Sequence, residues 1–583
     1  MRPIVFEGTV GWVHPAGDSR GVVIAGAHGF EDLCSRRFLT LMARRLAQAG
    51  LPVLQFDYPG CGDATGDHTE PHRVAAWVSS IETAIARLKA ETGVTDVLVI
   101  GFRLGALLAP SAIVGRDDVA GLALLAPPIS GKAYVREMAG LARMIDAALP
   151  PYGTEVEPFD GIETAGFRMS AETIADLRTL EWRELAGSLR QDVLLVTTQP
   201  ATSHSALAEG VAAAGGSVRI ETFAGFARLM SNPTANDIPQ STLEMVVGWA
   251  VERRKPVGAA SHEPVATAPV FLAAGGYNEW PLVLAPAPEI CGVLCMPAQA
   301  KPQGQVALIL NAGAIPHIGW ARGAVDMARS LARDGIASLR VDLPGLGQSG
   351  TPDEKRLFLY DERGRDDMLR IVNWLEQHGF DQVSAIGTCA GAYQAFHAAR
   401  FDRRIASLTM VNPLCFAWNS SYALDMELSK VRDNARGSLK PEDGAGEADV
   451  AEPHSHGTAL RSPRLKALLS RLGGRTLRFG LELSKSTTSN FWRRRGSGSQ
   501  SVETWMKNLT ARGTRVLVVS AESDRSLDEI ARHFGPDGER LRRMQGVTLV
   551  RLDAADHTLT PAHARSRLVE HVTQLLSPAA DGR

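Results

Sequence analysis

The chain has 583 residues, which is too long for one hydrophobic core and predicts roughly two to four domains. Apolar residues make up 45% and charged residues 22%, as in ordinary globular proteins, and a net charge of −2 argues against nucleic-acid binding. The N-terminal residues lack the apolar core of a signal peptide, no apolar run reaches about 18 residues, and the six cysteines are scattered. We therefore expect a cytoplasmic protein with reduced thiols.

The first half of the chain alternates predicted strands with predicted helices. Strands are expected at 21–26, 52–57 and 96–100, and helices at 36–50 and 74–91, from apolar runs and helical spacing of apolar residues. This order is typical of an α/β fold with a mostly parallel sheet covered by helices on both faces.

The same order returns in the second half. Strands are expected at 306–310, 337–342 and 383–386, with helices at 324–335 and after residue 391. The second half therefore predicts another α/β domain of the same kind.

Two short motifs recur at nearly the same offset. Residues 57–66 (DYPGCGDATG) match 342–350 (DLPGLGQSG) at an offset of 342 − 57 = 285. Residues 101–105 (GFRLG) match 387–391 (GTCAG) at an offset of 389 − 103 = 286. Two motifs in register indicate a duplicated domain, and we expect Asp57 and Asp342, which open turns in both copies, to be structural.

The pentapeptide at 387–391 has the form Gly-x-nucleophile-x-Gly between a predicted strand and a predicted helix. Its central residue, Cys389, is the predicted nucleophile. With the loop motif, these residues resemble the α/β-hydrolase superfamily, especially the serine-aminopeptidase-like hydrolases that bacteria associate with exosortase systems. The resemblance covers most of both halves but neither the segment between them nor an insertion at 425–500. It implies a triad in the chain order nucleophile, acid, base.

The acid is predicted to be Asp524, which lies just after the expected strand 515–520, where the family keeps its carboxylate. Asp528, four residues further on, is the alternative.

The base is predicted to be His557, in the loop between the expected strand 547–552 and the final helix. His533 and His317 are the alternatives. His317 is expected on an exposed loop, with a contact to substrate in the mouth of the site as the second interpretation.

In this interpretation His557 removes the thiol proton and Asp524 stabilises the imidazolium. The oxyanion is expected to accept hydrogen bonds from the backbone N–H of Ala390 and from one in the loop 311–314, that of Ala314. No cofactor or metal is expected. The cysteine elbow resembles those of dienelactone hydrolases and polyester synthases, so hydrolysis and acyl transfer both remain open for an ester or thioester substrate, small or carrier-bound.

The first half lacks all three groups. Arg103 occupies the nucleophile position and cannot attack a carbonyl, residues 199–202 offer no carboxylate, and residues 224–228 offer no histidine. His28, in the oxyanion loop, does not replace them. This half is predicted to be a catalytically degenerate domain in which Arg103 either binds an anion or pairs with a local carboxylate.

The domain boundaries follow composition. The degenerate domain is assigned to 1–251, a proline- and alanine-rich linker to 252–275, and the catalytic domain to 276–583. Residues 290–295 are predicted to add an edge strand, whose two cysteines are expected to be buried thiols rather than zinc ligands.

A cap insertion is expected at about 416–510, where the connection between predicted strands is far longer than usual. Its segment 461–495 is basic and carries one acid, Glu482. It is either a solvated face packed on the domain, a site for an acidic partner such as an acyl carrier protein, or a contact with an anionic membrane surface. Its ten basic residues are Arg461, Arg464, Lys466, Arg471, Arg475, Arg478, Lys485, Arg493, Arg494 and Arg495.

Together these patterns predict two fused α/β-hydrolase domains, the second an esterase, thioesterase or acyltransferase with a Cys-His-Asp triad. The alternative is a non-catalytic binding or scaffolding protein. The complete order Cys389, Asp524, His557 favours the enzyme.

Overall fold

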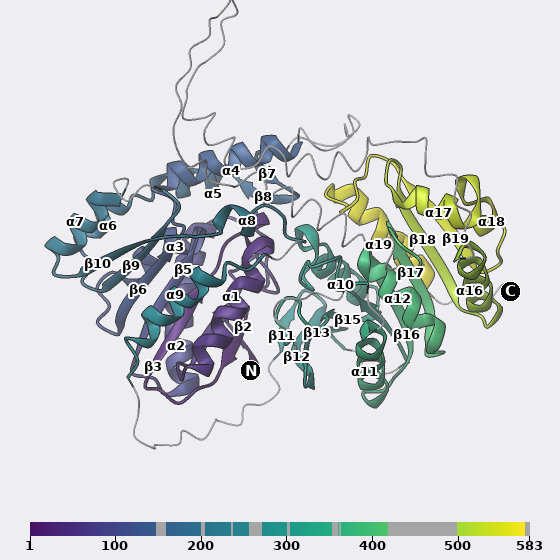
Figure 1. The fold of residues 1–583 in the computed structure, drawn as a ribbon, viewed down its shortest axis with the longest axis horizontal. Helices are drawn as coiled ribbons and strands as arrows, with labels where there is room; N and C mark the ends of the chain where they lie inside the picture. The colour runs from purple at the N-terminus through teal and green to yellow at the C-terminus, as the bar shows by residue number, and fades with distance from the viewer. Residues whose placement is uncertain are drawn as a thin grey trace, which may run out of the picture.

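The computed structural model describes residues 1–146, 159–199, 204–234, 237–255, 271–299, 304–351, 359–360, 363–417 and 498–577. Residues 256–270 of the expected linker and 418–497 of the expected cap, including the whole basic segment, lie outside the described residues. The described chain forms two α/β domains that lie side by side (Figure 1).

The first domain contains an eight-stranded sheet in the order β1-β2-β4-β3-β5-β6-β9-β10. β1, β2 and β4 pair antiparallel, and the remaining pairs are parallel. Its strands are β1 (Arg2–Phe6), β2 (Thr9–His14), β3 (Arg20–Ala25), β4 (Val53–Phe56), β5 (Asp96–Phe102), β6 (Val119–Leu125), β9 (Asp192–Thr197) and β10 (Ser217–Thr222), with the separate hairpin β7 (Gly161–Thr164) and β8 (Phe167–Ser170). Its helices are α1 (Phe30–Gln48), α2 (Arg73–Thr92), α3 (Leu104–Ile113), α4 (Gly131–Asp146), α5 (Ala171–Thr179), α6 (Trp182–Ala186), α7 (Ser205–Ala213), α8 (Phe226–Leu229) and α9 (Gln240–Val251).

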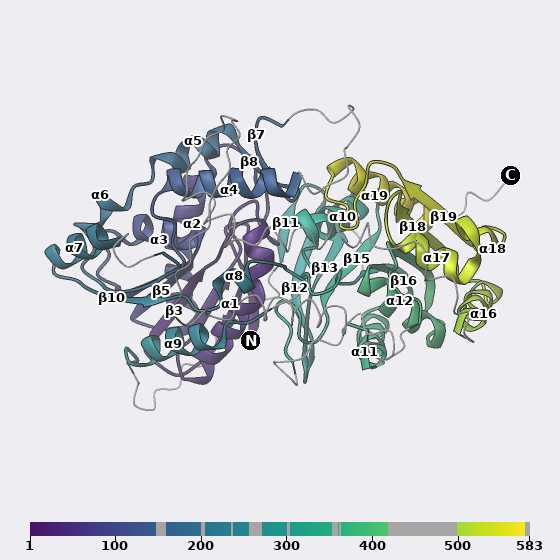
Figure 2. The same cartoon turned by 45° about the horizontal axis from the view of Figure 1, so that its top comes forward.

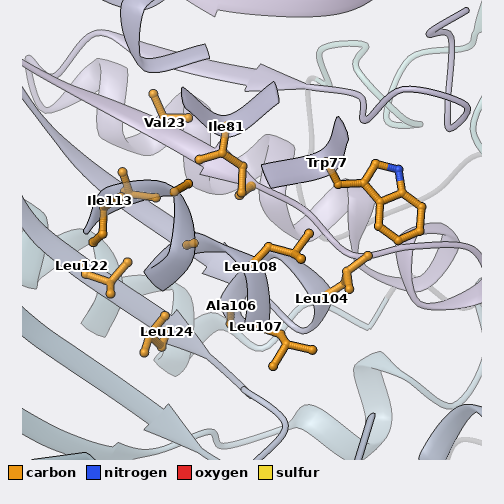
Figure 3. Close-up of a cluster of buried hydrophobic side chains, with 14 of the residues drawn as sticks. Val23, Trp77, Ile81, Leu104, Ala106, Leu107, Leu108, Ile113, Leu122 and Leu124 are labelled. Carbon is orange, nitrogen blue, oxygen red and sulfur yellow. The ribbon is translucent and has the colours of Figure 1, made fainter. Parts of the chain in front are cut away.

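Apolar side chains cover both faces of this sheet, as expected for buried parallel strands. Along β5, Val97 and Val99 point into one core cluster and Leu98 and Ile100 into another. The first cluster includes side chains of α2 and α3, among them Trp77 of α2 and Leu104, Leu107 and Leu108 of α3 (Figure 3). The second cluster includes side chains of α1 and α9. Helices α4 and α5 and the hairpin lie along one edge of the sheet (Figure 2).

The second domain repeats this plan with nine strands in the order β11-β12-β13-β15-β14-β16-β17-β18-β19. The pairs from β11 to β15 are antiparallel and the others are parallel. The strands are β11 (Leu272–Ala274), β12 (Tyr277–Pro286), β13 (Glu289–Pro297), β14 (Gly304–Ile309), β15 (Ala337–Asp342), β16 (Phe380–Thr388), β17 (Ile405–Val411), β18 (Arg515–Ala521) and β19 (Val547–Leu552). The helices are α10 (Gly323–Arg333), α11 (Arg363–Gln377), α12 (Ala390–Phe401), α16 (Gly498–Ala511), α17 (Ser526–Phe534), α18 (Glu539–Arg542) and α19 (Ala562–Leu576).

Three details differ from the sequence-based expectations. β13 is not an edge strand, because β12 pairs with its outer side and β11 pairs with β12 in turn. α1 begins at Phe30 rather than at residue 36, since its first turn is acidic and its apolar face starts at Leu33. β11 also begins within the stretch that was assigned to the linker.

The contact between the domains repeats itself at the duplication offset of 285. Arg37 of α1 donates to the carbonyl oxygen of Ser349 at 3.0 Å, and Arg322, just before α10, donates to that of Ala64 at 2.8 Å. Because 37 + 285 = 322 and 64 + 285 = 349, these two hydrogen bonds are equivalent.

A second pair of contacts follows the same rule. Arg44 donates to the carbonyl oxygen of Gln348 and Arg329 to that of Asp63, both at 2.8 Å. The two arginines are 285 residues apart, and so are the two acceptors. Helix α1, which follows β3, therefore contacts the loop 342–350 of the second domain. Helix α10, which follows β14, contacts the equivalent loop 57–66 of the first domain. This arrangement is that of a two-fold dimer built within one chain.

Ionised side chains are buried at the centre of this contact. Asp63 accepts from His317 and Arg340, both at 2.7 Å, and Glu279 accepts from Arg329 at 2.7 Å and from Arg340 at 2.5 Å. Buried charges are tolerated when each has a partner, and here three carboxylates face three cations. We call this set the ionic core; each member is at most 5% exposed, and the members are Asp63, Glu279, His317, Arg329, Arg340 and Asp342.

His317 was expected on an exposed loop or in the mouth of the active site, and both expectations are wrong. Its side chain is fully buried between Asp63 and Asp342, at 2.7 and 2.8 Å. Burial by itself would lower the pKa of the imidazolium, but the charges of the two carboxylates outweigh burial and raise that pKa to about 10. A loop position in the sequence did not reveal this burial, because the partner residue Asp63 belongs to the other domain.

The raised pKa of His317 makes the stability of the protein depend on pH. In the folded protein His317 holds its proton up to about pH 10, whereas the unfolded chain releases it near pH 6.5. The stabilisation is therefore complete below about pH 6.5 and is lost between there and pH 10, at up to about 1.4 kcal/mol per pH unit. The melting temperature of the wild type should fall over this range relative to that of His317→Gln. Parallel curves for the two proteins would contradict the charge state of His317.

Candidate active site

The turn after β16 has the geometry of a nucleophile elbow. Cys389 lies between β16 and α12 with φ 55° and ψ −114°, a conformation that L-residues seldom adopt. A Cβ atom at Gly387 would lie 2.1 Å from the carbonyl oxygen of Gly391, and one at Gly391 would lie 2.4 Å from that of Asn311. Both glycines are therefore required by the close crossing of strand, helix and neighbouring loop.

The structure brings the three predicted triad residues together. His557 Nδ1 lies 2.7 Å from Asp524 Oδ2. The imidazole is also close enough to Cys389 for its positive charge to lower the pKa of the thiol. The Asp524 side chain is 6% exposed and that of His557 33%. The site is thus shielded at the carboxylate and open at the imidazole.

The three groups shift one another's ionisation. Burial would raise the pKa of the Cys389 thiol, but the positive charge and hydrogen bond of His557 outweigh it and lower that pKa. Burial would lower the pKa of His557, but the thiolate and Asp524 raise it well above its ordinary value. Both shifts favour a thiolate beside an imidazolium over a neutral thiol and imidazole.

The alternative candidates have other contacts. Asp528 lies exposed on the first turn of α17, and Asp524 is the aspartate that contacts His557. His533 pairs with Glu529 at 3.0 Å on the same helix. His317 belongs to the ionic core.

Two residues at the site were not predicted. The Tyr360 hydroxyl lies 3.7 Å from the Cys389 sulfur, and its ring packs edge-on against Tyr393. Asn412, directly after β17, donates from Nδ2 to the carbonyl oxygen of His557 at 2.8 Å and accepts from the Ala521 N–H. Asn412 has φ 46°, which asparagine tolerates better than most residues, so an asparagine directly after a strand was the available signal.

The two predicted oxyanion donors belong to α12 and to the loop that packs against this helix. Ala390 directly follows Cys389 and is the first residue of α12. Ala314 is buried in the loop 311–319, which we call the oxyanion loop and which packs against α12 at Gly391. Asp342 stabilises this loop by accepting from the Asn311 side chain at 3.0 Å, a structural role as expected.

The elbow of the first domain has the same backbone and a different side chain. Arg103 has φ 51° and ψ −107°, and its guanidinium pairs with Glu31 at 2.6 Å and with Glu137 at 2.5 Å. It also donates to the carbonyl oxygen of Ala126 at 3.2 Å. Of the two predicted interpretations, pairing with local carboxylates is therefore the one observed, and Asp57 likewise has structural partners in Arg36 and the Asp63 N–H.

The structure describes two other parts of the first domain that the sequence analysis singled out. Residues 224–228 form the start of α8 and a preceding turn, and His28 is buried beside Trp77 at 5.3 Å between ring centroids. Residues 200–202 of the expected acid position lie outside the described residues.

The described residues contain no cluster of three or more side chains suited to a metal ion. All six cysteines are free, and Cys291 and Cys295 are buried in β13. Among the helices of the described part of the chain, none has the length and apolar character needed to cross a membrane.

Two family descriptions match the chain. The family described as serine aminopeptidase, S33, matches residues 17–209, and the alpha/beta hydrolase fold matches residues 308–532. The chain therefore belongs to the α/β-hydrolases and carries two such domains in tandem. It is an enzyme of the α/β-hydrolase type.

Solved structures cover about one domain each. Est1E from Butyrivibrio proteoclasticus is 18% identical with a TM-score of 0.31, and the match covers 43% of this chain and 98% of that one. Proline iminopeptidase of Mycobacterium smegmatis is 14% identical with a TM-score of 0.29, over 43% and 97%. The Pyrococcus furiosus esterase Pf2001 is 14% identical with a TM-score of 0.29, over 43% and 91%. No curated protein matches the chain.

The lowered pKa of Cys389 predicts that iodoacetamide modifies this thiol below the pH range of a free cysteine, whose pKa is about 8.5. Asp524→Asn should move the rate profile to higher pH, because the imidazolium loses the negative charge that stabilises it. Peptide mapping of Cys389 across pH measures both profiles. Asp528→Asn, on an exposed side chain, is the matched control and should leave the profile unchanged. A wild-type profile like that of a free thiol would contradict the ion pair.

Arg103→Ser should lower the free energy of unfolding by about 3–5 kcal/mol, because Glu31 is left buried without its cation. Arg103→Lys, which keeps the charge, should be less destabilised. In a Cys389→Ala background, neither variant should gain turnover of p-nitrophenyl esters. Turnover by the serine variant would show that the first domain retains an acid and a base.

Proposed function

We propose that the second domain is a cysteine hydrolase or acyltransferase that acts on an ester or thioester through an acyl-thioester on Cys389. The observation that carries this proposal is the Cys389 thiol at the elbow with His557 and Asp524 aligned behind it. A bystander cysteine does not require a neighbouring histidine that is oriented by a buried aspartate.

In the first step the Cys389 thiolate attacks the carbonyl carbon of the substrate. The carbonyl π electrons move to the oxygen, and the N–H groups of Ala390 and Ala314 donate hydrogen bonds to the resulting oxyanion. When the intermediate collapses, the bond to the leaving alcohol or thiol breaks and His557 gives its proton to the departing atom. The product is an acyl-thioester on Cys389.

In the second step His557, now neutral, accepts a proton from the acceptor, which attacks the thioester and releases Cys389. Water as the acceptor gives hydrolysis, and an alcohol, amine or thiol gives acyl transfer. Asp524 stabilises the imidazolium in both steps. Tyr360, 3.7 Å from the sulfur, is positioned to donate a hydrogen bond to the thiolate when the acyl group leaves.

The first domain is proposed to be catalytically inert. Its elbow carries an arginine that is paired with two carboxylates, and a guanidinium with a pKa above about 12 is not a nucleophile. Its role is structural or regulatory rather than chemical.

A reducing compartment such as the cytoplasm suits this site, because it keeps the thiol available. The basic segment 461–495 would bind an acidic partner, either an acyl carrier protein that delivers the substrate or an anionic membrane surface.

Intact-mass measurement after incubation with p-nitrophenyl acyl esters tests the proposal. The wild type should gain the mass of one acyl group, and Cys389→Ala should gain none. Cys415→Ala, which removes the other partly exposed thiol of this domain, is the matched control and should still form the adduct. A wild type without an adduct, or an adduct that persists in Cys389→Ala, would leave the non-catalytic scaffold as the better description.

A further inference from the structure

The oxyanion loop depends on a carboxylate of its own domain. Asp342 Oδ1 accepts from the N–H of His317 at 2.7 Å and from the side chain of Asn311, while Asp342 Oδ2 lies 2.8 Å from His317 Nδ1. The two ends of the loop therefore converge on one buried carboxylate. Ala314, the proposed oxyanion donor, lies between them in the sequence.

A second carboxylate reaches the same loop from the first domain. His317 Nε2 lies 2.7 Å from Asp63 Oδ2, so both ring nitrogens of a fully buried imidazole face carboxylates. A neutral imidazole donates from one nitrogen, and an imidazolium donates from both. Asp63 thus accepts the hydrogen bond from Nε2 that allows His317 to be buried as an imidazolium.

The equivalent loop of the first domain has no such dependence. At the offset of 285, Asp57 corresponds to Asp342 and Asp32 to His317. Arg36 of the same domain donates to both Asp32 and Asp57 at 2.7 Å. Asp32, in the first turn of α1, and Asp57, directly after β4, are therefore both paired with a cation from their own domain.

The residue of the second domain that corresponds to Asp63 is neutral and contacts helix α1 of the first domain. Gln348 corresponds to Asp63 at the offset of 285, and its side chain lies 3.3 Å from the Thr40 hydroxyl. The two copies therefore differ in where the charge that pairs with this region comes from. The inert domain holds its loop with its own residues, whereas the catalytic domain takes a charge from its neighbour.

We infer that Asp63 of the first domain is a positioning residue for the second, holding the oxyanion loop, through His317, at the distance from the elbow that acyl chemistry needs. This inference rests on the proposed function. The contact of the loop with α12 is close, since a Cβ atom at Gly391 would lie 2.4 Å from the Asn311 carbonyl oxygen. A small movement of the loop therefore alters the geometry between Ala314 and the carbonyl carbon attacked by Cys389.

The nucleophile itself does not depend on Asp63. The hydrogen bond between His557 and Asp524 and the electrostatic pairing of His557 with Cys389 lie within the second domain and involve no residue of the oxyanion loop. Loss of Asp63 should therefore reduce acyl transfer while leaving the thiolate intact. Formation of a thiolate and stabilisation of an oxyanion can be measured separately.

The test uses full-length Asp63→Asn. The kcat for p-nitrophenyl ester turnover should fall about 10- to 100-fold with KM within about twofold, as expected when an oxyanion donor is misplaced. The rate of Cys389 modification by iodoacetamide, which forms no oxyanion, should match the wild type. Glu279→Gln is the matched control, because Glu279 shares Arg340 with Asp63 and is equally buried but does not contact the oxyanion loop. It should lower the melting temperature and keep kcat.

A charge-balanced variant protects the test against loss of folding. Asp63→Asn combined with His317→Gln removes one charge of each sign from the ionic core, and the selective loss of kcat should persist. The inference is overturned if Asp63→Asn lowers the melting temperature but keeps kcat, or if iodoacetamide modification falls in parallel with kcat. A wild type that forms no acyl adduct overturns the proposed function and this inference together, and the adduct measurement identifies that case.

Discussion

The ionic core between the domains is the interaction on which the rest of the structure depends. Three carboxylates and three cations are removed from water at one contact, and each needs its partner because an unpaired buried charge is strongly destabilising. Asp63 comes from the first domain, whereas His317 and Arg340 come from the second. Without the first domain, the ionic core of the second domain would therefore contain three cations and only two carboxylates.

The duplication explains both the symmetry and the asymmetry of this contact. Equivalent arginines of the two domains reach equivalent carbonyl oxygens, as Arg37 and Arg322 do, so the contact resembles that of a homodimer. The buried charges then diverged, with Arg36 serving the first loop and Asp63 serving the second. The catalytic groups diverged as well, since one elbow carries Cys389 and the other Arg103.

Much of the fold and part of the site could be predicted from the sequence. The alternation of strands and helices, both elbows and the spacing of Asp524 and His557 follow from local patterns, and the structure places those side chains together. Tyr360 and the burial of His317 could not be predicted, because they depend on contacts between segments that no local pattern connects. β13 was misplaced at the edge because the preceding Pro-rich stretch was not expected to pair.

The elbow of the first domain keeps the strained backbone of a nucleophile elbow, although its central residue is an arginine. Arg103 retains a positive φ of 51°, beside 55° for Cys389, although no nucleophile needs to be presented there. Gly101 and Gly105 still meet backbone atoms at 2.6 and 2.0 Å where a Cβ would be, so the crossing of strand and helix imposes the turn. The strained turn is thus imposed by the crossing of strand and helix and does not depend on which side chain it carries. A strained elbow in this fold is evidence of ancestry, and activity has to be judged from the side chain that the elbow presents and the groups that surround it.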